Sequence, residues 1–215
     1  VDVMHERIEH MGERSNLLKA HVFQFDFLNG DFANLPKGLQ DIINDEEKRK
    51  RLVIYINPPY AEAASYGGGE NKRGVAAEHK ISHLFKEKVG RAINELFVQF
   101  FLRTYTQISG SILASFSTLK YINAQNFIKF RDVFSPQYKG GFICPAYTFD
   151  NVNGQFPIGF LIWDLSVKEP INDVVVDVYD AKEQKLQLKT ISPVRKNGFI
   201  VDWLRLYFDK ESDRL

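Results

Sequence analysis

The apolar run Leu52–Ile56, followed directly by Asn57-Pro58-Pro59-Tyr60, is the stretch that most restricts how this chain can fold. Its β-branched and aromatic residues predict a buried strand. Prolines lack the N–H that a sheet ladder needs and they fix φ, so the strand must end at Ile56 and the backbone beyond it is rigid. The strand therefore ends in a stiff platform that carries the Asn57 amide, a carbonyl without a ladder partner and the Tyr60 ring.

A platform of this kind can bind a planar group that bears an NH2. The amide and carbonyl oxygens accept its two hydrogens, and the aromatic ring stacks on its face. The alternative is a strand that ends in an ordinary proline turn with Tyr60 as a packing residue, because Asn-Pro is a common turn initiator. The sequence on either side favours the first interpretation.

Composition limits the class of protein. The chain has 215 residues, 44% of them hydrophobic and 13% aromatic, which predicts one ordered globular core. Its 28 basic and 27 acidic residues nearly cancel, so net charge gives no general argument for nucleic-acid binding. The single cysteine, Cys144, excludes an intrachain disulfide, and its apolar neighbours predict a buried packing residue. No membrane-spanning run or signal peptide is found, so we expect a cytoplasmic protein with no membrane partner.

Hydrophobic periodicity predicts alternating strands and helices. We expect strands at 22–27, 52–56, 112–116, 141–147 and 157–163, helices at 36–51, 75–103, 123–134 and 200–208, and a hairpin at 171–192 around Asp180–Glu183. Crossover helices between strands predict a mainly parallel sheet covered on both faces, and the late strands predict an antiparallel edge. Ligands of such folds bind beyond the carboxyl ends of strands, where both Asp31 and Asn57 follow a predicted strand.

Two motifs carry a family resemblance. Asn57-Pro58-Pro59-Tyr60 after an apolar strand resembles the catalytic motif of S-adenosyl-L-methionine-dependent amino-methyltransferases, especially the N6-adenine DNA methyltransferases. Asn29-Gly30-Asp31-Phe32 resembles the cofactor motif that precedes it in that family. Weaker matches follow in the family's order and bring the resemblance to roughly residues 20–165: Glu95–Phe101, Gly110–Ala114 and Phe156–Ile162.

The resemblance implies a fold class and a domain plan. The fold would be α/β, with a Rossmann-like class I methyltransferase sheet that is mostly parallel with an antiparallel edge. It would be N-terminally incomplete, because the family's Gly-rich first cofactor loop is not found and Gly67–Gly69 comes too late in the chain to replace it. Residues 1–165 would be a partial catalytic core, and 166–215 a hairpin and extension leading toward a target-recognition region.

The resemblance also implies the chemistry. The Asn57 side-chain oxygen and the Pro58 carbonyl would accept the hydrogens of the adenine amine. Pro59 would complete the catalytic motif, and Tyr60 would stack on a base turned out of the duplex. A second aromatic residue should cover the other face of the base, with Phe149 the first choice and Phe156 the second.

The cofactor implied by the resemblance is S-adenosyl-L-methionine. Asp31 would accept from its adenine amino group, while Phe32 packs on its ring. The implied partners are double-stranded DNA and the nuclease and target-recognition domains of a longer restriction–modification polypeptide. We expect the isolated chain to be inactive because the first cofactor loop is not found.

Several alternatives stay open. Asp31 is equally well explained as a helix N-cap, and ordinary core packing explains either phenylalanine. Asp26 is expected to belong to its strand and not to the site. His79 and His83, four residues apart on a predicted helix, are expected to be solvated and not metal ligands. The functional alternatives are a protein glutamine N5-methyltransferase, whose substrate amide is a similar planar NH2, and a non-catalytic methyltransferase-like DNA-binding module.

Overall fold

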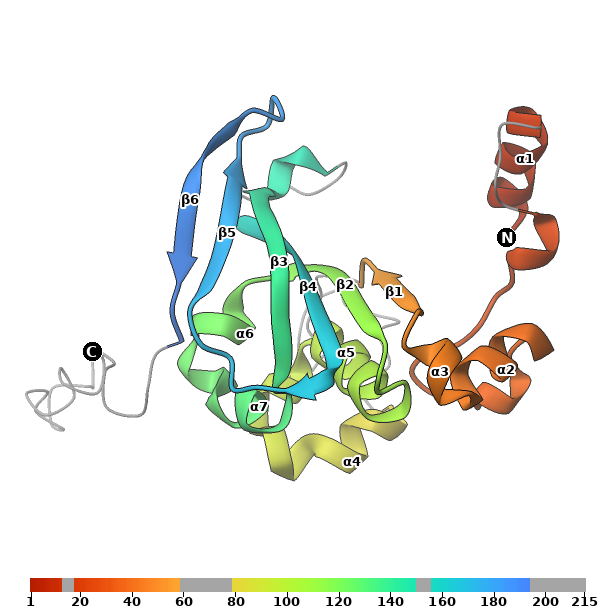
Figure 1. The fold of residues 1–215 in the computed structure, drawn as a ribbon, viewed down its shortest axis with the longest axis horizontal. Helices are drawn as coiled ribbons and strands as arrows, with labels where there is room; N and C mark the ends of the chain where they lie inside the picture. Colours follow the sequence, from red (N-terminus) through yellow and green to blue (C-terminus); the bar gives the residue numbers. More distant parts are fainter. Residues whose placement is uncertain (13–17, 59–78, 150–155, 194–215) are drawn as a thin grey trace, which may run out of the picture.

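The computed structural model of the chain describes residues 1–12, 18–58, 79–149 and 156–193 (Figure 1). The strands are β1 Val53–Ile56, β2 Ile112–Thr118, β3 Pro136–Pro145, β4 Pro157–Lys168, β5 Val174–Tyr179 and β6 Lys185–Ile191. The helices are α1 Asp2–Met11, α2 Lys37–Asn44, α3 Glu46–Arg49, α4 Lys80–Val89, α5 Leu96–Gln107, α6 Lys120–Asn123 and α7 Ile128–Val133. Short 3-10 helices are η2 Lys19–His21, η3 Phe32–Asn34, η5 Gly90–Asn94, η6 Gln125–Phe127 and η7 Ala146–Thr148. No helix within these described residues is long and apolar enough to cross a membrane.

The six strands form one mixed sheet in the order β1-β2-β4-β3-β5-β6. The pairs β1–β2 and β3–β5 are parallel, while β4 is antiparallel to both β2 and β3, and β6 is antiparallel to β5. Four strands, β1, β2, β3 and β5, therefore share one direction, and the predicted α/β fold is confirmed. The expected antiparallel edge is β6, but the second antiparallel strand, β4, lies inside the sheet between β2 and β3.

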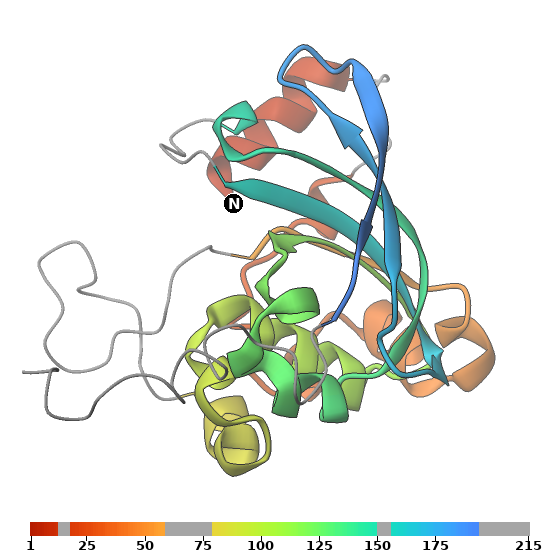
Figure 2. The ribbon, with the colours of Figure 1, turned by 90° about the vertical axis from the view of Figure 1, so that its left-hand side faces the viewer.

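Helices α4 to α7 lie together on one side of the sheet (Figure 2). Their aromatic side chains pack against Leu113, Leu161 and Trp163, which are fully buried on that side. The Trp163 indole N–H donates to the Tyr121 hydroxyl at 3.1 Å, so this buried donor is satisfied. On the opposite side of β1, Val53 and Tyr55 are 60% and 63% exposed. The expectation of cover on both faces is therefore wrong for this part of the described sheet.

The expected strand at 22–27 is also wrong. Residues 22–26 belong to no strand, and Phe27 begins a turn. Phe25 and Phe27 are partly buried against a small apolar cluster, while Phe23 is 42% exposed. The Phe27 ring stacks on Phe100 of α5 with ring centroids 5.3 Å apart. A short alternating run of this kind therefore does not establish a strand, because apolar residues in a loop that packs on a helix can show the same pattern.

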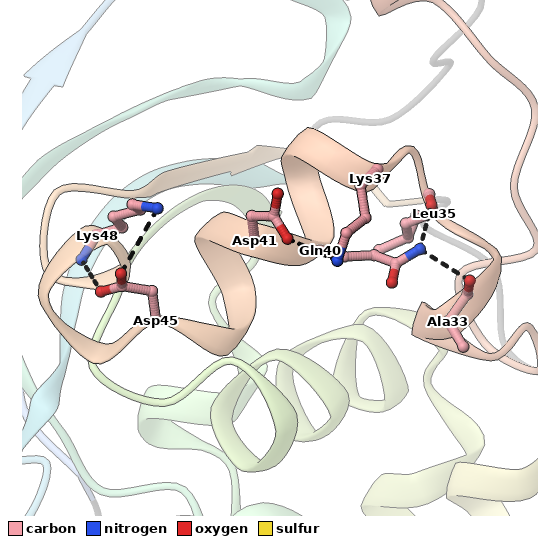
Figure 3. Close-up of polar contacts among 7 residues, drawn as sticks. All are labelled: Ala33, Leu35, Lys37, Gln40, Asp41, Asp45 and Lys48. Atoms are coloured by element: carbon pink, nitrogen blue, oxygen red, sulfur yellow. Dashed lines mark hydrogen bonds and ion pairs between the residues drawn. The ribbon is translucent and has the colours of Figure 1, made fainter.

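The two long predicted helices are interrupted. Asp45 separates α2 from α3, because its side chain accepts from the Lys48 backbone N–H and caps α3 (Figure 3). Gly90, with φ of 61°, ends α4, and α5 begins only at Leu96. Of the apolar residues predicted to face the core here, Val89, Ile93, Leu96 and Phe97 are buried, Phe100 is partly buried and Leu84 is 63% exposed. The expected helix at 200–208 lies outside the described residues.

The hairpin predicted at 171–192 is confirmed as β5 and β6. The Asp180 carboxylate accepts from the backbone N–H of Lys182 at 2.8 Å and of Gln184 at 2.9 Å, which closes the turn. β5 pairs with β3, so the hairpin belongs to the same sheet as the rest of the strands. The expected domain boundary between residues 165 and 166 falls inside β4.

Candidate functional site

The end of β1 places the first half of the catalytic motif. β1 pairs in parallel with β2, from Val53 opposite Ile112 to Ile56 opposite Ser115. Asn57 comes next and is exposed, and Pro58 is buried. Both residues follow the carboxyl end of a parallel strand, as predicted from the sequence. Pro59 and Tyr60 lie outside the described residues.

The turn Asp26–Phe32, called the polar turn below, is shaped by Asp26. Its Oδ1 accepts from the backbone N–H groups of Leu28 and Asn29, each at 3.1 Å. The Asn29 side-chain hydrogen bond, helped by these backbone donors, lowers the pKa of the Asp26 carboxyl. The expectation that Asp26 belongs to a strand is wrong, because its carboxylate instead folds the turn that carries Asp31. Asp26 does not line the cavity described below. Gly30 is required here, since a Cβ would lie 2.7 Å from the Asp26 carbonyl oxygen.

Arg103 of α5 anchors the polar turn through hydrogen bonds to its backbone. Its guanidinium donates to the carbonyl oxygens of Phe27 and Gly30 and lies 4.4 Å from the ring centroid of Phe32. Desolvation lowers the pKa of this guanidinium, while Asp26 and Asp31 act in the opposite direction. Sequence reasoning missed Arg103. The feature that could have indicated it is a charged residue that follows the largely apolar first two turns of a helix, since a buried charge needs partners.

Asp31 has two distinct oxygens. Oδ1 accepts from the Ala33 N–H at 2.9 Å and caps η3, as the N-cap interpretation predicted. Within the described residues, Oδ2 has no hydrogen-bond partner. Asp31 and Phe32 line a cavity of about 480 Å³, called the polar cavity below, with Lys80, Leu84 and Arg103 among its other walls. The capping role therefore leaves one carboxylate oxygen for a ligand.

The segment after Asp31 is tied to α2 (Figure 3). The Gln40 side-chain amide donates to the carbonyl oxygens of Ala33 at 2.9 Å and Leu35 at 2.7 Å. One turn of α2 is further supported by the ion pair between Lys37 and Asp41, 2.8 Å apart. The polar turn is thus fixed on its C-terminal side as well as by Arg103.

The two candidate stacking residues lie in different places. The Phe149 ring is 5.1 Å from that of Phe116 in an edge-on contact, and both line a cavity of about 540 Å³. Phe116 follows Ser115, the partner of Ile56, so Phe149 lies toward the strand end that carries Asn57. Phe156 is 40% exposed and lines another cavity, of about 530 Å³. Asn57 and Pro58 line none of these three cavities.

His79 and His83 differ in their surroundings. His83 is exposed, but His79 is only 8% exposed, and its Nδ1 lies 3.0 Å from Asn29 Nδ2. The expectation that both are solvated is therefore wrong for His79. The described part of the chain contains no group of three His, Cys, Asp or Glu residues able to hold a metal ion. Cys144 is buried, as predicted, and burial raises the pKa of its thiol.

Comparison with known proteins gives structural likenesses alone. No protein-family model matches the chain, and none of the curated proteins matches it. A cryo-EM structure of a DrdV–DNA complex is similar over 69% of this chain and 18% of its own, with 18% identity and a TM-score of 0.48. The ATP-dependent Type ISP restriction-modification enzyme LlaBIII bound to DNA is similar over 86% of this chain and 13% of its own, with 10% identity and a TM-score of 0.47.

A third similar structure is a nuclease-deletion mutant of the Type ISP restriction-modification enzyme LlaGI in complex with a DNA substrate mimic. It is similar over 76% of this chain and 19% of its own, with 14% identity and a TM-score of 0.45. The chain therefore spans less than a fifth of each of these three structures. With every TM-score under 0.5, the likenesses carry no argument about this chain.

Proposed function

We propose that residues 1–215 form part of the catalytic core of an S-adenosyl-L-methionine-dependent N6-adenine DNA methyltransferase, within a longer restriction–modification polypeptide. The observation that carries the proposal is the position of Asn57 and Pro58. They follow directly on a strand that is parallel to its neighbour, at the edge where α/β folds bind their ligands. This is the location that the motif resemblance requires.

The chain's own residues would orient and activate the acceptor. The adenine amine is a poor nucleophile because its lone pair is delocalised into the ring. Acceptance of its two hydrogens by the Asn57 side-chain oxygen and the Pro58 carbonyl oxygen favours a tetrahedral, nucleophilic nitrogen. The remaining contribution is orientation, with Tyr60 on one face of the turned-out base and Phe149 on the other.

The polar cavity fits the adenine end of the cofactor. A primary amine needs an acceptor, and the Asp31 carboxylate has one oxygen that no described residue engages. The neighbouring Phe32 ring supplies an apolar face for a planar group. S-adenosyl-L-methionine would supply a methyl group that its sulfonium already activates.

The test is methyl transfer from labelled cofactor to duplex DNA by the complete polypeptide that contains these residues. We expect Asn57→Ala to lower the rate by about 100-fold, because acceptor orientation is lost. Asn44→Ala, at the exposed end of α2, serves as the matched control and should leave the rate unchanged. Undiminished transfer by Asn57→Ala would contradict the role of Asn57.

The acceptor is tested in the same assay. Transfer to a glutamine-bearing peptide, with none to DNA, would instead identify a protein glutamine methyltransferase. DNA binding in a gel-shift experiment without transfer to either acceptor would identify a non-catalytic binding module. Each alternative thus has its own outcome.

A further inference from the structure

We propose that Asn29 is a positioning residue that joins the polar turn to the start of α4, the helix that follows the catalytic segment in the chain. The joint itself depends only on the contacts described below. Its consequence for cofactor binding rests on the proposed function. Asn29 belongs to the motif that contains Asp31, yet the motif resemblance gives it no role.

Every hydrogen-bonding atom of the Asn29 side chain is engaged. Nδ2 donates to Asp26 Oδ2 at 3.0 Å and lies 3.0 Å from His79 Nδ1. Oδ1 accepts from the Lys80 backbone N–H at 3.2 Å. The Asn29 amide therefore links the polar turn to His79 and Lys80, which lie 50 and 51 residues further along the chain.

The partners fix the orientation of this amide. A carboxylate only accepts and a backbone N–H only donates, so Nδ2 must face Asp26 and Oδ1 must face Lys80. His79 Nδ1 is then left as the acceptor of the second Nδ2 hydrogen, which assigns the proton of the neutral ring to Nε2. Rotating the amide by 180° would set its oxygen against the Asp26 carboxylate and its NH2 group against the Lys80 N–H, so both of these contacts would be lost.

The start of α4 needs such an acceptor. The first N–H groups of a helix have no acceptor within the helix, and a side-chain oxygen usually supplies one from the preceding residue. Here Asn29 supplies it for Lys80 from a distant segment, while the His79 N–H donates to Ser82 Oγ at 3.1 Å. Ile81 is only 2% exposed, so the helix start is anchored in the core as well.

The joint connects two walls of one cavity. Asn29 and Asp31 line the polar cavity from the turn, while Lys80, Ile81 and Leu84 line it from α4. A ligand that moves Asp31 therefore also moves the acceptor of the Lys80 N–H, and the reverse holds by linkage. Cofactor binding at Asp31 is therefore coupled to the N-terminal end of α4.

The test is hydrogen–deuterium exchange with and without substitution of Asn29. In Asn29→Ala we expect exchange of residues 79–84 to rise by about five-fold, because a helix cap is lost. Exchange across 26–31 should rise as well, while residues 157–168 of β4 should not change. Asn34→Ala is the matched control, since the Asn34 side chain is exposed and makes no hydrogen bond within the described residues. Equal exchange at 79–84 in Asn29→Ala and Asn34→Ala would overturn the proposal.

A second variant covers the case in which Asn29→Ala loosens the whole chain. His79→Leu places an apolar side chain in this buried position and removes the Nδ1 acceptor. We expect faster exchange at 26–31, on the far side of the joint, with β4 unchanged. Unaltered exchange at 26–31 would contradict the part that His79 plays in the joint.

A cofactor arm separates this inference from the proposed function. Saturating S-adenosyl-L-methionine, added to the complete polypeptide, should slow exchange at both 26–31 and 79–84 in the unsubstituted protein. In Asn29→Ala it should slow exchange at 26–31 alone. Slowing at both segments in the variant would disprove the coupling. No slowing in the unsubstituted protein would instead contradict the cofactor role of Asp31 and leave the joint to be judged by the cofactor-free exchange.

Discussion

The polar turn and the aromatic cluster on the side of the sheet that carries Tyr55 are built from different interactions. In the polar turn, Asp26, Asn29 and Arg103 make directional hydrogen bonds, several of them to backbone groups. The aromatic cluster instead consists of rings whose centroids lie 4.8 to 6.3 Å apart: Tyr55, Phe116, Phe142, Phe149 and Phe160. The polar turn is stabilised by hydrogen bonds, each of which needs both its donor and its acceptor. The aromatic cluster is stabilised by the area of contact between its rings.

This difference teaches where each region is vulnerable. Removing one partner of a buried hydrogen bond leaves the other unsatisfied, which costs more than the bond contributes. Ring contacts lose only part of their energy when one ring becomes a smaller apolar group. We therefore expect single substitutions in the polar turn to lower the free energy of unfolding more than those in the aromatic cluster. We also expect only the polar turn to respond to pH.

The largest expected effect is that of Arg103→Met. The variant loses two charge-assisted hydrogen bonds and the contact with the Phe32 ring, which together stabilise the fold by about 3 kcal/mol. Urea denaturation near neutral pH measures the free energy of unfolding. Arg91→Met, at an exposed position of η5, is the control and should change it by about 0.5 kcal/mol or less. Equal effects of the two substitutions would contradict the anchoring role of Arg103.

A smaller loss is expected for Gly30→Ala. The added Cβ meets the Asp26 carbonyl oxygen and the Phe25 ring, each at 2.7 Å, so the turn must shift at a cost of about 2 kcal/mol. Gly38→Ala in α2 is a matched control, because its Cβ would meet nothing within 4 Å. It should stabilise the chain by about 1 kcal/mol through helix propensity. Thermal or urea denaturation of both variants gives the comparison, and a neutral Gly30→Ala would show that the turn is loosely held.

In the aromatic cluster, Phe116→Leu should cost about 1 kcal/mol, because edge-on ring contacts are lost while apolar contact remains. Phe23→Leu serves as its control, since Phe23 is 42% exposed. The free energy of unfolding is again measured by urea denaturation. A loss as large as that of Arg103→Met would remove the distinction between the two regions.

The smallest effect is a pH dependence confined to the polar turn. The folded-state pKa of Asp26 is lowered below the ordinary value of 3.8, so its contribution is present above that pH and is lost as pH falls through the folded pKa. The difference in unfolding free energy between the unsubstituted chain and Asp26→Asn should therefore stay constant from pH 7 down toward 3.8 and narrow as pH falls below 3.8. The corresponding difference for Phe116→Leu should stay constant. A constant difference for Asp26→Asn would show that the carboxylate is not stabilised in the fold.

Local sequence predicted the elements whose signals are local. The run before Asn57, the strand at 112–116 and the hairpin turn at Asp180 each combine an apolar period with a proline, glycine or Asx signal, and each is present. The strand expected at 22–27 was predicted from a local signal of the same kind, but the structure has no strand there. The residues alternate between apolar and polar as in a strand, but the Phe27 ring packs on Phe100 of α5. This long-range contact cannot be read from the local pattern.

The candidate site divides along the same line. Asp31 and Asn57 were found because each follows a recognisable motif. Arg103 and the partners of Asn29 were missed, since Arg103 lies 73 residues from Gly30 and His79 lies 50 residues from Asn29. No periodicity in a single sequence indicates which carbonyl a distant guanidinium will reach.

The sequence by itself determined that the strand stops at Ile56 and that an amide and a carbonyl follow, because proline geometry is a property of the chain alone. The tertiary structure alone decided that β4 lies inside the sheet and that Arg103 is buried beneath the polar turn. It also decided that one oxygen of Asp31 caps a helix while the other meets no described partner. These outcomes depend on which polar groups are buried and which hydrogen-bond partners they find there. Both are determined by contacts between segments that lie far apart in the sequence.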